Sequence, residues 1–160
     1  MVLVKLTTAE MLLAGQVGVM RSVQHRLKGT EHRHGADGGF YGWGMDLLGA
    51  LGEAAVAKWS GIWWSGMGMG IEAGDVGALE VRCVESVKRR LILHPDDKDD
   101  APYILVCAEP PNFRLMGWLL GEDGKREEYW ADPTGNNRHA YFVPNDRLNA
   151  MQQLEQTEWI

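Results

Sequence analysis

The spacing of hydrophobic and polar residues changes along the chain and separates a helical part from a strand-rich part. Apolar residues recur at helical spacing over residues 8–27, and Thr7 and Glu10 are placed as a capping pair, so this segment predicts an amphipathic helix. A second helix is predicted over residues 45–59, where many side chains are small and permit close packing against a neighbour. From residue 75 the period falls to two, which is typical of strands.

Four strands are predicted between residues 75 and 121, arranged as an antiparallel meander. Turn-forming residues separate the runs ALEVRCV, LILHP, YILVCAE and FRLMGWLL. A fifth short strand is expected at 141–143, and Pro144 precedes a final helix over 145–156, capped by Asn145 or Asp146. Two glycine-rich segments, 28–44 and 63–74, are expected to be loops.

This order of elements predicts an α+β fold in one domain spanning residues 1–160, with a curved, mainly antiparallel sheet flanked by helices. The chain has 160 residues, 45% of them hydrophobic, which is enough to bury a substantial core. No stretch is long and apolar enough to cross a membrane, and the N-terminal segment lacks the features of a signal peptide. Cys83 and Cys107 lie in apolar strands, so we expect reduced thiols and a cytoplasmic location.

The formal net charge of −6 is unevenly distributed. Residues 1–90 hold 10 Lys and Arg against 9 Asp and Glu, whereas residues 91–160 hold 6 against 13. Proteins that bind nucleic acid through its backbone are usually basic, so a nucleic-acid contact here would need a local basic strip. The densest run of basic residues, Lys88-Arg89-Arg90, is the candidate for this contact, and Arg21 is a further candidate residue. The alternative is that the run is a solvated turn.

Several common sites are absent from the sequence. It contains no phosphate-binding GxxxxGK[ST] loop, no GxSxG nucleophile elbow and no CxxC pair. His32-Arg33-His34 could hold a transition metal together with His25, but loop histidines without a Cys or carboxylate partner are more often solvated.

A spaced set of carboxylates is the most informative feature. Glu53 shares a helix face with small and apolar residues, where a carboxylate needs a cation, an arginine or a metal unless it reaches solvent at the edge. Asp75 lies in a turn between glycines, and Glu80 and Arg82 project from one face of a strand. Carboxylates of this kind hold Mg²⁺, and a nearby cation stabilises charge on a phosphate. The alternative for Glu80 and Arg82 is a surface ion pair of little net value.

The order helix Glu, then Asp, then Glu-x-Lys on a strand resembles the PD-(D/E)XK nuclease superfamily. Here Glu53, Asp75 and Glu80-Val81-Arg82 match it within about 30 residues. The segments GALGE, GDVGALEVR, MGWLL and AYFVP also resemble a group of small phage and prophage proteins, over roughly residues 45–150. The resemblance implies a restriction-endonuclease-like core. Two departures stand out: Arg82 replaces the lysine, and Asp75 lies so close to Glu80 in sequence that a tight turn or a bulge at Gly77 is required to bring both onto one face.

The resemblance implies a Mg²⁺- or Mn²⁺-dependent nuclease that hydrolyses phosphodiester bonds in DNA. Glu53, Asp75 and Glu80 would be the metal ligands, and Arg82 would contact the scissile phosphate. The alternative is a non-catalytic module of the same fold that binds nucleic acid or a protein; a structural or assembly protein is a third hypothesis. DNA is the expected partner, with a second copy of the chain or another phage protein as a further one, no membrane contact, and the host cytoplasm as the location.

Overall fold

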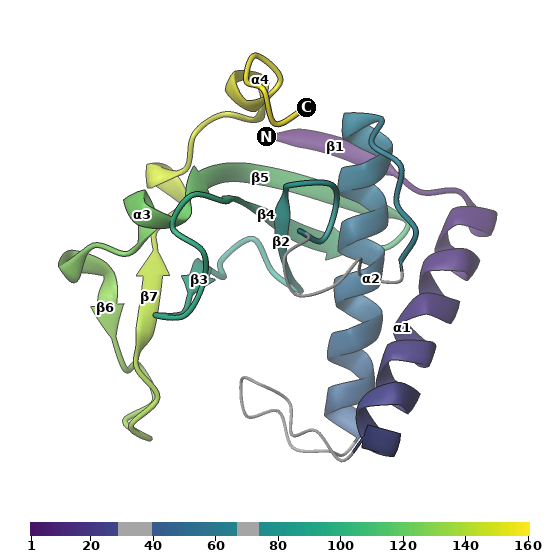
Figure 1. Cartoon of the computed structure of the whole chain (residues 1–160), viewed down its shortest axis with the longest axis horizontal. Helices are drawn as coiled ribbons and strands as arrows, with labels where there is room; N and C mark the ends of the chain where they lie inside the picture. The colour runs from purple at the N-terminus through teal and green to yellow at the C-terminus, as the bar shows by residue number, and fades with distance from the viewer. Residues whose placement is uncertain (29–39, 67–73) are drawn as a thin grey trace.

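The computed structural model describes residues 1–28, 40–66 and 74–160 and has a mixed α+β architecture with two sheets (Figure 1). In chain order its elements are β1 (Val2–Lys5), α1 (Thr8–Lys28), α2 (Phe40–Ser60), β2 (Glu80–Val84), β3 (Leu91–Leu93), β4 (Pro102–Glu109), β5 (Asn112–Leu120), α3 (Gly121–Gly124), η1 (Glu127–Tyr129), β6 (Trp130–Ala131), β7 (Ala140–Val143), η2 (Asn145–Arg147) and α4 (Met151–Leu154). The strands pair mainly antiparallel, as expected.

The larger sheet has the order β1-β5-β4-β2, and β4 is buried along nearly its whole length. One side of this sheet packs against α2, with Val56, Ile104 and Phe113 in the shared core. A second core, which includes Leu91, Tyr103 and Val143, joins the other side to the small sheet β3-β7-β6. The molecule therefore layers the small sheet, the large sheet, α2 and finally α1 (Figure 1).

The first helix agrees with its prediction in bounds and in its cap. Thr7 Oγ1 accepts a hydrogen bond from the backbone N–H of Glu10, and Glu10 Oε2 accepts one from the N–H of Thr7, which is a reciprocal capping box. The side of α1 that faces α2 includes the small residues Ala14, Gly18 and Ser22. A methyl group at Gly18 would lie 2.6 Å from the Cα atom of Leu47, so the two helices approach closely because Gly18 has no side chain.

The predicted start of the second helix at residue 45 is wrong, because α2 begins at Phe40. The glycines of this segment indicated a loop, but tertiary packing favours the helix: the Arg26 guanidinium of α1 lies 4.5 Å from the ring centre of Trp43. The predicted final helix over 145–156 is also wrong in extent. Helical turns at η2 and α4 are separated by an extended segment, because Asn149 exchanges two backbone hydrogen bonds with Trp118.

The predicted four-stranded antiparallel meander over 75–121 is wrong in its connections. Strand β2 pairs with β4 in parallel, and β3 leaves to pair with β7 in the second sheet. The chain makes this crossover through the exposed turn that contains Lys88-Arg89-Arg90. Strand β1, which no pattern in the sequence indicated, completes the larger sheet against β5. The strand expected at 141–143 is present as β7.

Candidate functional site

Glu53 is the buried carboxylate of the candidate site and lies on α2 at 4% exposure. Its two oxygens accept hydrogen bonds from the Arg21 guanidinium of α1 at 2.5 and 2.7 Å. Oε2 also accepts a bond from the indole N–H of Trp64 at 2.9 Å. Gly52 brings this part of α2 against β2, because a methyl group there would lie 2.8 Å from the Cys83 side chain. Glu53 is therefore compensated by an arginine, which was one of the options that its position suggested.

Asp75 is brought next to β2 by the tight turn that the short spacing requires. Val76 and Leu79 exchange two backbone hydrogen bonds around Gly77, which has a φ of +63° that favours glycine. The Oδ2 atom of Asp75 then accepts a hydrogen bond from the backbone N–H of Val81 at 2.8 Å. The turn thus fixes the Asp75 carboxylate at the start of the strand that carries Glu80.

Glu80 and Arg82 project from the same side of β2, but each is paired with a residue from the loop that follows β3. The Lys98 ammonium lies 3.3 Å from Oε1 of Glu80, and the Arg82 guanidinium lies 2.9 Å from Oδ1 of Asp97. Arg82 also lies 4.9 Å above the ring centre of Tyr103 in β4. The surface ion pair between Glu80 and Arg82 considered from the sequence is thus replaced by two pairs that cross between elements.

The loop that supplies Asp97 and Lys98 is held in place from α3. The Lys125 ammonium, which follows α3, bonds the backbone oxygens of Pro95 and Asp97 and the carboxylate of Asp99. Gly121 lies so close to the Lys98 carbonyl that no larger residue fits there. The sequence pattern predicts a turn at 96–99 but assigns Lys98 no part in the site. The feature that could have indicated Lys98 is that it is a single lysine among four aspartates.

The three predicted carboxylates influence one another electrostatically. Burial raises the pKa of Glu53 above its usual value, the Arg21 hydrogen bonds oppose this, and the charge of Asp75 adds to the increase. Burial likewise raises the pKa of Glu80, again with a contribution from Asp75. Asp75 is therefore the carboxylate whose charge acts on both of the others, and the cluster holds negative charge that its cations offset only in part.

The predicted nucleic-acid residues lie in two different environments. Arg21 is largely buried beside Glu53, and its guanidinium also donates to the Gly66 carbonyl. Lys88, Arg89 and Arg90 are exposed in the turn between β2 and β3. Two of the three histidines considered as metal ligands, His32 and His34, lie outside the described residues. The third is His25, whose Nδ1 atom lies 3.7 Å from Oδ2 of Asp46.

The fit of the cluster to a metal ion depends on how many carboxylates are required. Among residues 1–28, 40–66 and 74–160, no group of three or more His, Cys, Asp or Glu side chains is placed to hold one. Mg²⁺, however, is commonly bound through one or two carboxylates, with waters and substrate phosphates as the other ligands. Asp75 and Glu80, at the start of β2, are the two carboxylates that could meet that smaller requirement, whereas Arg21 and Trp64 occupy both oxygens of Glu53.

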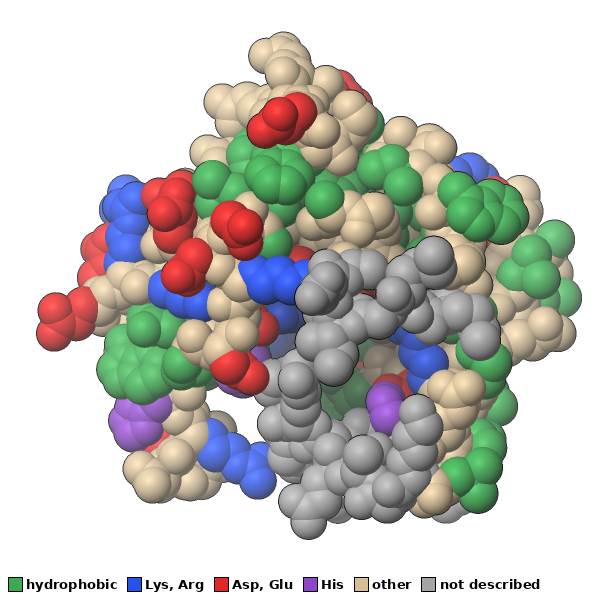
Figure 2. Space-filling model, in the orientation of Figure 1, with side chains coloured by type: hydrophobic (Ala, Val, Ile, Leu, Met, Phe, Trp, Pro, Cys, Tyr) green, Lys and Arg blue, Asp and Glu red, His purple; other side chains and the backbone are tan. Residues whose placement is uncertain are grey.

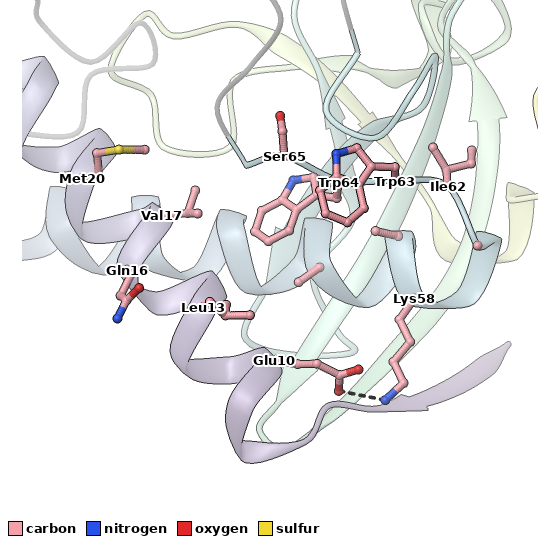
Figure 3. A pocket seen from close by; sticks show the side chains of 13 residues that line it. Glu10, Leu13, Gln16, Val17, Met20, Lys58, Ile62, Trp63, Trp64 and Ser65 are labelled. Atoms are coloured by element: carbon pink, nitrogen blue, oxygen red, sulfur yellow. Dashed lines mark hydrogen bonds and ion pairs between the residues drawn. The ribbon is translucent and has the colours of Figure 1, made fainter.

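An apolar pocket of about 730 Å³ adjoins this cluster (Figure 3). It lies between α1, the C-terminal half of α2 and the segment Gly61–Ser65, and the Glu10–Lys58 ion pair marks one end. Trp64 connects the pocket to the carboxylate cluster, because it lines the pocket and its indole N–H donates a hydrogen bond to Glu53.

Comparison of the chain with protein-family models, with curated proteins and with solved structures gives no match. In the part of the chain that the structure describes, no helix is long and apolar enough to span a membrane.

Proposed function

We propose that the chain is a divalent-metal-dependent nuclease that hydrolyses phosphodiester bonds in DNA. One observation carries this proposal: the tight turn at Gly77 brings Asp75 beside Glu80, with the Lys98 ammonium next to Glu80. Two neighbouring carboxylates with an adjacent cation, at the start of a strand, form an arrangement suited to phosphate chemistry.

The charge of the cluster favours a cation over a phosphate. Among the described residues, Arg21, Arg82 and Lys98 face the four carboxylates of Glu53, Asp75, Glu80 and Asp97. The cluster therefore carries one net negative charge and would repel a DNA phosphate by itself. A divalent cation would reverse that sign, so phosphate binding at this cluster is expected to require one.

Each residue of the cluster has a separate role in the proposed site. Asp75 and Glu80 would hold Mg²⁺ or Mn²⁺, which polarises a phosphoryl oxygen and lowers the pKa of a coordinated water. Glu53 stays bound to Arg21 and Trp64 and contributes negative charge. Lys98 would supply, from another loop, the lysine charge that the PD-(D/E)XK pattern places at position 82, because its ammonium bonds Glu80 and its side chain is 38% exposed.

The decisive experiment incubates the purified chain with labelled single- and double-stranded DNA in Mg²⁺, Mn²⁺ or EDTA. We expect cleavage only with metal, and Glu80→Gln should lower the rate at least about a hundredfold. Glu109→Gln is the matched control, because Glu109 is also a glutamate at a strand end that forms an ion pair, in its case with Arg114, but it lies exposed and outside the cluster. DNA that is retained but never cut would refute the nuclease and favour the non-catalytic binding module.

A second measurement tests the metal site without activity. A metal that binds only the folded state stabilises it by about 2.7 kcal/mol at a hundredfold excess over Kd, which for this size is a shift of several degrees. Glu80→Gln should raise the melting temperature without metal, because it removes a charge next to Asp75, and should abolish most of the metal response. A melting curve that does not respond to Mg²⁺ or Mn²⁺ would count against the proposed site.

A further inference from the structure

The side of α1 that points away from α2 is apolar. Amphipathic surface helices normally turn their apolar side to the core, but here the small residues Ala14, Gly18 and Ser22 face inward. Leu12 and Leu27 are 64% and 83% exposed. We define the α1 outer face as Leu12, Leu13, Gln16, Val19, Met20, Val23 and Leu27.

The shape of this face is a ridge between two apolar hollows. The pocket of about 730 Å³ lies on one side of α1, where Leu13, Val17 and Met20 line it together with Trp64 (Figure 3). A second hollow of about 460 Å³ lies on the other side, against Leu47. Gln16 and Met20 line both, so they form the crest that separates them. Hydrophobic side chains line the edge of the molecule where Figure 1 places α1 (Figure 2).

We propose that the α1 outer face is the interface of a homodimer in which the α1 helices of two copies pack antiparallel. A ridge flanked by hollows on the same surface can interlock with a copy of itself, as a two-fold interface requires. The sequence of the face supports the antiparallel direction, because reversal about the midpoint between Val19 and Met20 exchanges six of the seven positions in pairs, Leu12 with Leu27, Gln16 with Val23 and Val19 with Met20, and leaves only Leu13 without a counterpart in the face.

The area and the charge of the face favour a second copy over other occupants. With the 87%-exposed Trp63 beside it, the face presents on the order of 700 Å² of apolar surface, close to the roughly 800 Å² that each partner buries in a stable interface. None of its seven residues is charged, so two copies would meet without like-charge repulsion. The same absence of cations disfavours nucleic acid, and the net charge of −6 disfavours an anionic membrane surface.

Sedimentation equilibrium on the full chain tests the interface. We expect a species of twice the 17.9 kDa chain mass that dissociates on dilution. Val19→Glu would place two carboxylates at the two-fold axis and should give a monomer. Val87→Glu is the matched control, because Val87 is also a half-exposed valine, 42% against 47%, but lies in the turn before β3. It should remain dimeric.

Other results would overturn the proposal. A wild-type chain that is monomeric at every concentration, or a Val19→Glu variant that stays dimeric, would refute the interface. Circular dichroism shows whether the variant is folded; if it is not, Leu12→Lys serves instead, since Leu12 is more exposed. Cysteine pairs test the direction: Leu12→Cys/Leu27→Cys should form intermolecular disulfides. Efficient cross-linking by Leu12→Cys alone would indicate parallel helices and refute the proposed packing.

Discussion

Replacing Arg21 with alanine should destabilise the protein substantially, because Glu53 would remain buried without its cation. Breaking a fully buried ion pair costs about 3–5 kcal/mol. The Arg21 side chain is 24% exposed, so water can reach part of the vacated volume, and we expect a loss of about 3 kcal/mol. For a domain of this size, this lowers the melting temperature by roughly 6–12 °C.

The loss should depend on pH in a direction fixed by Glu53. Arg21 opposes the increase in the Glu53 pKa that burial causes, so its removal raises that pKa further. A carboxyl group whose folded-state pKa exceeds the unfolded value contributes stability at low pH and loses that contribution as pH rises through the folded pKa. The deficit of Arg21→Ala relative to wild type should therefore be largest at neutral pH and shrink as the pH falls into the acidic range and Glu53 takes up a proton.

Urea denaturation of both proteins over this pH range measures the deficit directly. Arg114→Ala is the control, because Arg114 forms an exposed pair with Glu109 and should contribute almost nothing. Arg21→Lys should fall between wild type and alanine, since it keeps the charge but loses the two-pronged contact. An Arg21→Ala deficit no larger than that of Arg114→Ala, or one that does not shrink on acidification, would refute the account of Glu53 as a buried carboxylate held by Arg21.

Two further predictions concern packing and thiol chemistry. Gly18→Ala should lower the free energy of unfolding by about 1–3 kcal/mol, because the added methyl group meets the Leu47 backbone. Gly49→Ala should raise the free energy of unfolding by about 0.5–1 kcal/mol, because the added methyl group has open space. Urea titration measures both changes, and two changes of the same sign would contradict this prediction. Cys83 and Cys107 should react slowly with a thiol dye in the native protein, because burial raises the pKa of Cys83 to about 12 and Cys107 is inaccessible; rapid labelling would count against this.

The predictions that succeeded rest on local signals. Helix α1 could be located because the helical spacing of its apolar residues and its N-terminal capping residues are both visible over a short stretch of sequence. The turn at Gly77 was predictable because Asp75 and Glu80 are too close in sequence to share a site otherwise. Strand β7 was recognisable as a short apolar run before Pro144.

The predictions that failed depend on contacts between distant residues. The parallel pairing of β2 with β4 is not visible in the period of either strand, because both pairing directions give the same alternation. The Lys98 contact with Glu80 spans 18 residues and depends on how α3 and Lys125 hold a loop. The compensation of Glu53 by Arg21 spans 32 residues, so the sequence could indicate that a partner was needed without identifying it.

The two unusual features of α1 have one physical origin. Because Gly18 and its neighbours on the inner side are small, α1 lies close enough to α2 for Arg21 to reach Glu53 with both nitrogens. Leu12 and Leu27 lie on the opposite side of the helix from these small residues and point outward. The apolar period that predicted an amphipathic helix therefore describes an outer face rather than a core face. A helix that uses its small residues to hold a buried charge pair leaves its large residues for a partner outside the fold.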